Sequence, residues 1–266
     1  MKRALAGALV VAAAALALVF LVLPIVAIFL RVPPGHLIHQ LSSPIVTDAL
    51  VVSFKTTAIA QVLILVFGTP LAWLIASRRF RGRSLAITLV ELPLVLPPAV
   101  AGLGLLAAFG RFGLLSTNIA FTQTAVVFAV AFVSSPLYIR QGIAAFEAVD
   151  PNLVAASRTL GAGPGRTFFR VVLPLAWNGL AAGEALAFAR GLGEFGATIM
   201  FAGSLQGVTQ TLPLAIYSAF AINFDTALAM GALLVAISLV LLLVLKVVLS
   251  WRPSRPTSSF LFARSS

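Results

Sequence analysis

Long apolar runs recur through this chain, and the first extends from Ala4 to Leu30 without a polar side chain. A helix needs about 20 apolar residues to cross the hydrocarbon core of a bilayer. Of the 266 residues, 61% are hydrophobic and 9% are charged, whereas about a quarter of the residues in a soluble domain are charged. We therefore predict an all-α, polytopic integral membrane protein, which excludes a soluble enzyme, a secreted scaffold and a nucleic-acid-binding module.

The apolar runs predict about six transmembrane helices in a single domain, residues 1–266. The first run, 4–30, follows Lys2 and Arg3. It is longer than the apolar core of a signal peptide, about 7–15 residues, so we interpret it as an uncleaved span. Residues 31–48 are polar enough to form a loop. The core of the domain, 56–250, holds the other spans, which we expect at 56–77, 85–109, 119–139, 174–200 and 226–249.

The third of these spans cannot be a straight helix. It contains Pro93, Pro97 and Pro98, and a proline inside a helix removes a backbone hydrogen bond and clashes with the preceding turn. Irregular backbone at membrane depth is tolerated where it lines a cavity or is buried in protein. We therefore expect this span to border a pathway.

Basic residues outnumber acidic residues by 18 to 7, so the formal net charge is +11. Cytoplasmic loops of membrane proteins carry an excess of Lys and Arg. The split between the two sides is 14 to 3, with Arg31, Lys55 and Arg111 on the outer side, and it predicts that both termini are cytoplasmic. The residues expected inside are Lys2, Arg3, Arg78, Arg79, Arg81, Arg83, Arg140, Arg158, Arg166, Arg170, Lys246, Arg252, Arg255 and Arg264.

Several kinds of chemistry find no support in the residues. The chain has no cysteine, which excludes a disulfide and a thiolate metal site. His36 and His39 share one short polar segment, but no acidic residue is closer than Asp48, so we predict no metal site. An intramembrane enzyme would need a nucleophile or metal constellation at membrane depth, and no such pairing is present. No internal repeat supports an inverted-repeat secondary transporter.

The longest non-apolar stretch, 141–173, joins the fourth and fifth spans. Asp150 or Asn152 can cap a helix and Pro151 suits its first turn. A short amphipathic helix, 153–160, should follow, and Gly161, Gly163, Pro164 and Gly165 should break it. The pattern predicts a compact projection into water that a partner could bind, although an ordinary connecting loop remains an alternative.

Residues 155–176, AASRTLGAGPGRTFFRVVLPLA, resemble the coupling-loop motif of ABC-transporter permeases. That motif reads E-A-A, three residues, G, nine residues, I, one residue, L-P. Here Gly161, Val171 and Leu173-Pro174 keep the spacing. Ala155 stands where the family usually has glutamate, so a salt bridge from that position to the ATPase is not expected.

A second stretch is similar to the molybdate and tungstate permeases. It comprises ARGLGEFGATIMFAG, residues 189–203, and TQTLPLAIY, residues 209–217. The related sulfate permeases share much of this pattern. The resemblance extends over roughly 51–249, so it covers most of the chain.

The resemblance implies the permease fold of a type I ABC importer in the plasma (cell inner) membrane. It implies a homodimer, two copies of a cytoplasmic ATPase and an extracytoplasmic oxyanion-binding protein. The implied function is import of a tetrahedral oxyanion, molybdate or tungstate, with a sulfate or thiosulfate permease as the alternative. An ion-gradient-driven secondary anion transporter or a channel is the alternative from another class.

The chain itself should not be an enzyme. The glycines at 161, 163 and 165 lack the lysine of a phosphate-binding loop, so a separate ATPase must bind ATP and Mg²⁺, and we expect no cofactor here. The residues expected to couple the permease to that ATPase are Leu153, Val154, Ala155, Ala156, Leu160, Gly161, Val171, Leu173 and Pro174. Because Gly161 should end the helix, we expect it to have a positive φ.

Ionisable residues inside a span are costly and become candidates for the translocation path or gate. They are Glu91, Glu184, Arg190 and Glu194. Arg190 and Glu194 are four residues apart and can pair on one helix face, whereas Glu184 lies six residues before Arg190, on a different face. Arg190 either belongs to a structural ion pair or supplies positive potential along an anion path. We expect the pathway between the third and fifth spans, at the dimer axis.

Overall fold

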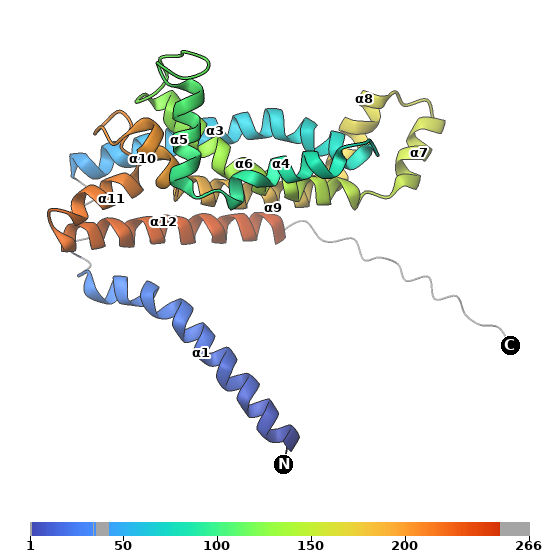
Figure 1. The fold of residues 1–266 in the computed structure, drawn as a ribbon. Helices are drawn as coiled ribbons and strands as arrows, with labels where there is room; N and C mark the ends of the chain where they lie inside the picture. The colour runs from blue at the N-terminus through green and yellow to red at the C-terminus, as the bar shows by residue number, and fades with distance from the viewer. Residues whose placement is uncertain (1, 34, 36–42, 251–266) are drawn as a thin grey trace.

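The computed structural model describes residues 2–33, 35 and 43–250, and all their regular secondary structure is helical (Figure 1). The all-α prediction is thereby confirmed for this part of the chain. The helices are α1 Lys2–Arg31, α3 Pro44–Ser77, α4 Arg83–Val95, α5 Pro98–Phe109, α6 Gln123–Glu147, α7 Pro151–Thr159, α8 Pro164–Thr167, the π-helix η1 Phe168–Val172, α9 Leu173–Leu192, α10 Gly196–Ala202, α11 Leu212–Phe220 and α12 Phe224–Ser250.

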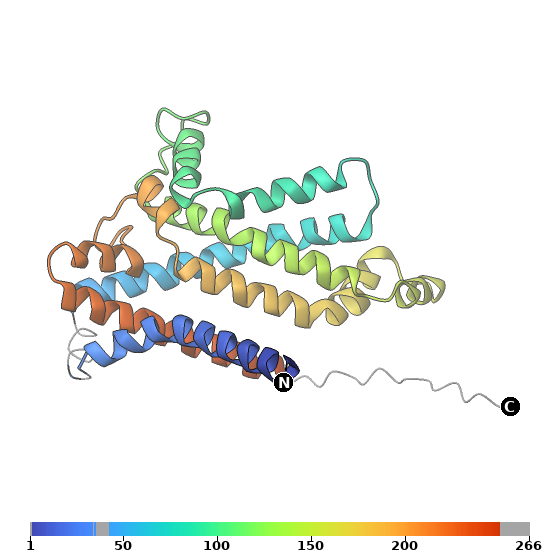
Figure 2. The ribbon, with the colours of Figure 1, turned by 60° about the horizontal axis from the view of Figure 1, so that its bottom comes forward.

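Three long helices, α3, α6 and α9, form the centre of the molecule, with α6 packed against both others. Small residues let them approach closely. A Cβ added to Gly179 on α9 would lie 2.5 Å from Cβ of Ala145 on α6. Similarly, Gly68 on α3 faces the side chain of Tyr138. Figure 2 shows α4 and α12 along the flanks of this centre.

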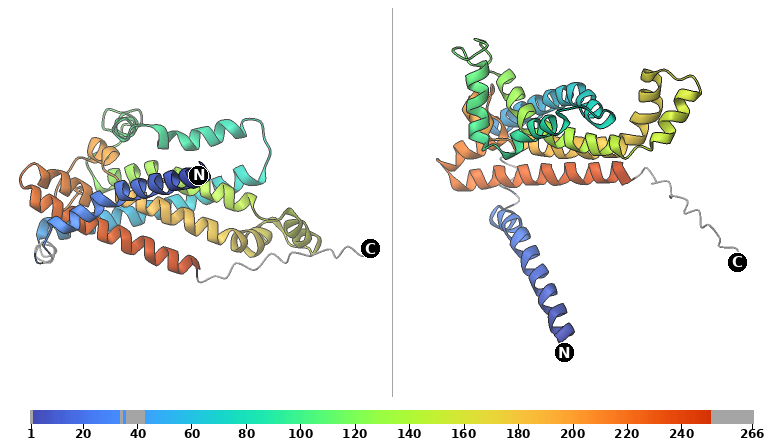
Figure 3. Two further views of the ribbon diagram at one scale, coloured as in Figure 1. Left: turned by 90° about the horizontal axis from the view of Figure 1, so that it is seen from below. Right: turned by 45° about the vertical axis from the view of Figure 1, so that its right-hand side comes forward.

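The helix α1 is apolar from Ala4 to Leu30, and no residue of its 26-residue span, Ala6–Arg31, is buried within the chain. It contacts α12 and then diverges from the other helices (Figures 1 and 3). A water-soluble protein could not expose such a helix, so its surroundings must be lipid or other apolar helices. One helix thus covers the predicted first span, 4–30, and it is long and apolar enough to cross a membrane.

Five helices are long and apolar enough to cross a membrane, and the bent pair α4 and α5 makes a sixth candidate. The chain bends by 112° between the two helices of this pair. The break falls at Leu96, whose extended backbone (φ −64°, ψ 135°) ends α4 just before Pro97 and Pro98. Extended backbone is what a residue preceding proline prefers. The prediction that this span cannot be straight is therefore confirmed.

Three helices differ in their bounds from the predicted spans. The second helix starts at Pro44 rather than 56, so the predicted loop at 31–48 is partly helical. The fourth helix continues to Glu147 rather than ending at 139. The fifth helical segment, formed by α8, η1 and α9, runs from Pro164 to Leu192, whereas the predicted span was 174–200. Apolarity marks the part of a helix that lies in hydrocarbon, whereas helices also continue into the polar layers, where backbone hydrogen bonds remain favourable.

Polar contacts tie these extensions to their neighbours. Lys55 donates to Gln123 at the start of α6 (2.9 Å), and Gln206 donates to Asp48 (3.2 Å). Figure 1 shows the starts of α3 and α6 at the end of the bundle opposite α7 and α8, which project from the other end. The histidines at 36 and 39 and the basic tail from 251 onwards lie outside the described residues.

Candidate functional site

The projection between α6 and α9 begins with the capped helix α7, Pro151–Thr159. A carboxylate oxygen of Asp150 accepts a hydrogen bond from the backbone N–H of Asn152 (2.8 Å), and Pro151 occupies the first turn. The chain leaves the helix through Gly161, whose φ of +82° lies in the left-handed region that favours glycine. Both the short helix and the positive φ were predicted from the sequence.

The projection is joined firmly to the spans. Ser157 on α7 and Thr167 on α8 share a hydrogen bond of 3.0 Å. The next residue, Phe168, begins the π-helix η1 and packs against Trp73 on α3 and Phe146 on α6, with ring centroids 5.5 and 6.1 Å away. π-Helical turns are rare and are frequent at functional sites. These contacts join α7 to the start of α9 through α8 and η1.

The nine residues expected to couple to an ATPase divide between the surface and the interior. Leu153 is 47% exposed and Leu160 is 88% exposed, with Ala155 and Ala156 exposed between them. Val154 and Leu173 instead pack against the hydrophobic cluster at this end of the bundle. The other members of the set lie at the turn, in η1 and in the first turn of α9: Gly161, Val171 and Pro174.

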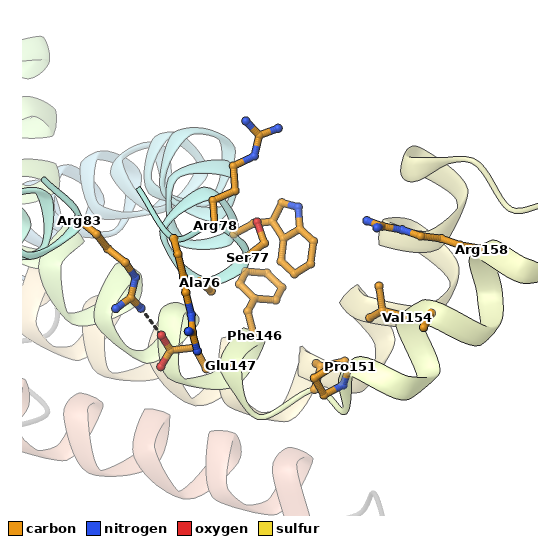
Figure 4. A pocket seen from close by; sticks show the side chains of 13 residues that line it. Ala76, Ser77, Arg78, Arg83, Phe146, Glu147, Pro151, Val154 and Arg158 are labelled. Carbon is orange, nitrogen blue, oxygen red and sulfur yellow. Dashed lines mark hydrogen bonds and ion pairs between the residues drawn. The ribbon is translucent and has the colours of Figure 1, made fainter. Parts of the chain in front are cut away.

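A cavity of about 640 Å³ lies between α7 and the ends of α3 and α6 (Figure 4). Arg83 borders it, forms an ion pair with Glu147 and donates to the carbonyl of Ile75 (2.9 Å). The sequence analysis did not identify this cavity, because its lining comes from three separated segments. The only sequence signal for the cavity was the cluster of arginines after residue 77. We used these arginines only to predict which side of the membrane they face.

At the other candidate site, Arg190 and Glu194 form the predicted ion pair, with N–O distance 2.7 Å. The Glu194 side chain is only 1% exposed, whereas that of Arg190 is 34% exposed. The helix α9 ends at Leu192, so Arg190 lies in its last turn. Glu194 also accepts a hydrogen bond from the N–H of Ala197 (2.8 Å), near the start of α10. The Glu194 carboxylate therefore binds a residue on each side of the helix break, Arg190 in α9 and Ala197 in α10.

The break lies against the bent third span, because α10 packs closely on α5. A Cβ added to Gly102 would lie 2.6 Å from the carbonyl oxygen of Ala197 and 2.7 Å from Cβ of Met200. A Cβ added to Gly196 would lie 2.5 Å from Cβ of Pro98. The structure therefore brings the third and fifth spans together where both deviate from regular helix.

The four ionisable residues predicted for the path do not form one cluster. Glu91 on α4 pairs with Arg140 on α6 at 3.5 Å, and both side chains are partly exposed. Glu184 lies on α9, and its buried Oε2 atom has no hydrogen-bond partner among the described residues. Only Arg190 and Glu194 contact each other.

One polar residue near this pair was missed. Gln61 on α3 is 4% exposed, and neither its amide nitrogen nor its amide oxygen has a partner within the described part of the chain. It faces Gly191, since a Cβ added there would lie 3.3 Å from the Gln61 Nε2 atom. In the sequence, Gln61 is the one side-chain amide in the apolar run of the predicted second span. This isolated polar residue was the signal that could have identified it.

The chain matches known transport proteins over most of its length. Residues 68–253 match the family model described as "Binding-protein-dependent transport system inner membrane component". The "Molybdenum transport system permease protein ModB" of Mycobacterium tuberculosis is 44% identical over 235 residues, which cover 85% of this chain and 88% of that protein. The "Probable transport system permease protein NifC" of Clostridium pasteurianum is 37% identical over 90% of this chain and 86% of that protein.

Solved structures share the fold at low identity. A bacterial alginate ABC transporter, in complex with a periplasmic protein that binds an alginate pentasaccharide, has a chain with TM-score 0.68 and 19% identity, covering 92% of this chain and 93% of that one. The methionine transporter MetNI has a chain with TM-score 0.59 and 17% identity, covering 77% and 93%. The predicted permease fold is therefore confirmed. This chain belongs to the family of inner membrane components of binding-protein-dependent transport systems.

Proposed function

We propose that this chain is the translocation subunit of an ATP-driven importer that carries molybdate, or the chemically similar tungstate, into the cytoplasm. The observation that carries the proposal is the 44% identity, over most of both chains, to proteins named as molybdenum transport permeases. The proposal is supported by the capped α7, the left-handed Gly161 and the buried ion pair at a helix break.

In the proposed complex, two copies of the chain form the pathway and each α7 docks on one cytoplasmic ATPase. The exposed side chains of Leu153 and Leu160 provide apolar contacts for a helix-in-groove interface. An extracytoplasmic binding protein delivers the anion to the opposite end of the bundle. ATP and Mg²⁺ are bound by the ATPase, and the permease turns the movement of α7 into movement of α9 through η1.

We assign to Arg190 the role of attracting the transported anion. A dianion needs compensating charge or water to cross a medium of low dielectric constant. The guanidinium of Arg190 is partly exposed, while its partner Glu194 is buried and holds it in place. The carboxylate offsets part of the positive charge, so the site attracts an anion without trapping it.

The proposal is tested by uptake into proteoliposomes that contain the permease, its cognate ATPase and the cognate binding protein. We expect uptake of radioactive molybdate that requires ATP and is inhibited by tungstate much more strongly than by sulfate. An ATPase variant that binds but does not hydrolyse ATP serves as the control. Uptake driven by an ion gradient without ATP, or preferential uptake of sulfate, would refute the proposal.

A further inference from the structure

The cavity behind α7 is strongly basic. Its volume of about 640 Å³ is far larger than a single tetrahedral oxyanion needs. Four arginines border it, from the loop after α3, the start of α4 and α7. The residues that line it are Trp73, Ala76, Ser77, Arg78, Arg79, Arg83, Phe146, Glu147, Val149, Pro151, Val154, Ala155 and Arg158.

Most of the positive charge in this cavity is uncompensated. Glu147 is its one acidic lining residue, and it is engaged by Arg83. Arg78, Arg79 and Arg158 have no ion pair or hydrogen bond from their side chains within residues 43–250. Figure 4 shows Arg158 extending from α7 across the opening towards the end of α3, where Arg78 lies. Three guanidinium groups therefore border one opening with no protein anion to balance them.

Apart from the arginines, Glu147 and Ser77, the lining is apolar. Phe146 and Val154 line the cavity, and Trp73 stacks edge-on against Phe146, with ring centroids 5.3 Å apart. A small hydrated anion gains nothing from such a surface, whereas an amphiphile places its charged group among the arginines and its glycerol and first methylenes against the aromatic rings.

The cavity also lies at the end of an apolar helix, where we expect the helix to leave the bilayer. It opens where the apolar helix α3 ends at Ser77, and Leu74, one turn earlier, is 44% exposed. Tryptophan is enriched at this level of membrane proteins, and Trp73 lines the cavity. Basic pockets between transmembrane helices on the cytoplasmic side bind the headgroups of anionic lipids.

We propose that this cavity binds the phosphate headgroup of an anionic phospholipid, with Arg78, Arg79 and Arg158 as the charged contacts. The inference rests on the orientation given with the proposed function, in which α7 is cytoplasmic. Because Arg158 belongs to α7 and the other two belong to the loop after α3, the lipid connects the coupling projection to the bundle. Its occupancy sets how firmly α7 is held against the spans.

The test uses the purified full-length permease and native mass spectrometry with phosphatidylglycerol, phosphatidylcholine or inorganic phosphate as the probe. We expect phosphatidylglycerol to bind more tightly than phosphatidylcholine. Replacing one arginine near a membrane surface weakens binding about fivefold. We therefore expect Arg158→Gln to weaken phosphatidylglycerol binding about fivefold and the double variant Arg78→Gln, Arg79→Gln to weaken it about 25-fold.

The matched control is the double variant Arg81→Gln, Arg166→Gln, which removes the same charge from the same end of the molecule but from outside the cavity lining. Its phosphatidylglycerol affinity should stay within twofold of the unmodified protein. Arg83 is left in place, because its loss would also disrupt the contacts to Glu147 and Ile75.

Three results would overturn the proposal. Equal losses in the cavity and control variants would indicate general surface attraction. Displacement of the lipid by millimolar inorganic phosphate, with equal affinity for the two lipids, would identify a site for free oxyanions. Unchanged lipid binding with lost ATPase association in Arg158→Gln would assign the cavity to the ATPase. Lipid binding is measured on the permease alone, so failure of the transport proposal would not affect it.

Discussion

The ion pair of Arg190 and Glu194 stabilises a helix break, and we have also proposed that Arg190 attracts the transported anion. Glu194 is buried, neutralises Arg190 and accepts a hydrogen bond from the N–H of Ala197 at the start of α10. Removing one partner of a buried pair costs about 3–5 kcal/mol, because the other charge is left unpaired, whereas removing both is often nearly neutral. This difference separates a structural role for Arg190 from a role in anion transport.

We expect the double variant Arg190→Gln, Glu194→Gln to assemble like the unmodified protein, because the glutamine oxygen can still accept from Ala197. Its molybdate uptake should nevertheless fall below a tenth, since the path has lost its positive charge. Arg190→Lys should keep part of the uptake. The measurements are permease yield from the membrane and uptake in proteoliposomes. Full uptake by the double variant would show that Arg190 is only a structural partner.

The backbone at Gly161 allows an equally direct experiment. Its φ of +82° costs any other L-residue about 1 kcal/mol or more, and a β-branched side chain more still. Gly161→Val should therefore distort the end of α7 and abolish ATP-driven uptake while the protein still reaches the membrane. Gly163→Val is the matched control, because Gly163 has φ −67°, ψ 166° and open space around it. Normal ATPase copurification and uptake by Gly161→Val would contradict the docking of α7.

Among the helices, α5 and α10 form the closest contact near the proposed path. Glycine at 102 allows the two backbones to approach, since a methyl group there would overlap the carbonyl oxygen of Ala197. Neither helix is long enough to span a bilayer alone. Their mutual packing, together with α6, therefore determines where the helix break at Glu194 lies.

Gly102→Ala should destabilise the permease by about 1–3 kcal/mol, the usual cost of overpacking, and should lower uptake. Gly104→Ala on the same helix meets no atom within 4 Å and should have no such effect. Thermal unfolding in detergent measures the loss of stability, and proteoliposome assays measure the loss of uptake. Equal thermal stability of the two variants would mean that α5 and α10 separate in the assembled transporter.

The whole molecule is organised by the direction of its long helices across the membrane. The 34 residues of α3 extend over about 51 Å, well beyond the roughly 30 Å of the hydrocarbon core. Its two ends must therefore lie on opposite sides of the membrane. Arg78, Arg79 and Arg83 border the same cavity as α7, which agrees with the charge distribution that predicts this end to be cytoplasmic.

Reporter fusions test this orientation. A fusion at Ser43, just before α3, should report the outer side, and a fusion at Gly163 should report the cytoplasm, because positive charge is retained inside. A fusion at Gly82, in the loop after α3, should agree with Gly163. The readouts are alkaline phosphatase activity for the outer side and green fluorescence for the inner side. The same side for Ser43 and Gly163 would refute the topology.

The sequence by itself determined the features that depend on local physics. Apolar runs must lie in lipid, which predicts the spans. Pro97 and Pro98 must interrupt a helix, Asp150 and Gly161 must delimit α7, and residues four apart on one helix must be able to pair. The coupling motif was also readable, because its residues are contiguous.

Only the tertiary structure decided what depends on contacts between distant segments. It extended α3 and α6 beyond their apolar parts, paired Glu91 with Arg140, and placed Gln61 beside Gly191. It also assembled the basic cavity from three separated segments. The physical reason is that the partner of a polar group at membrane depth depends on which helices face each other. The packing of these helices is set by small residues, such as Gly179 against Ala145 and Gly102 against Ala197, whose neighbours are far away in the chain.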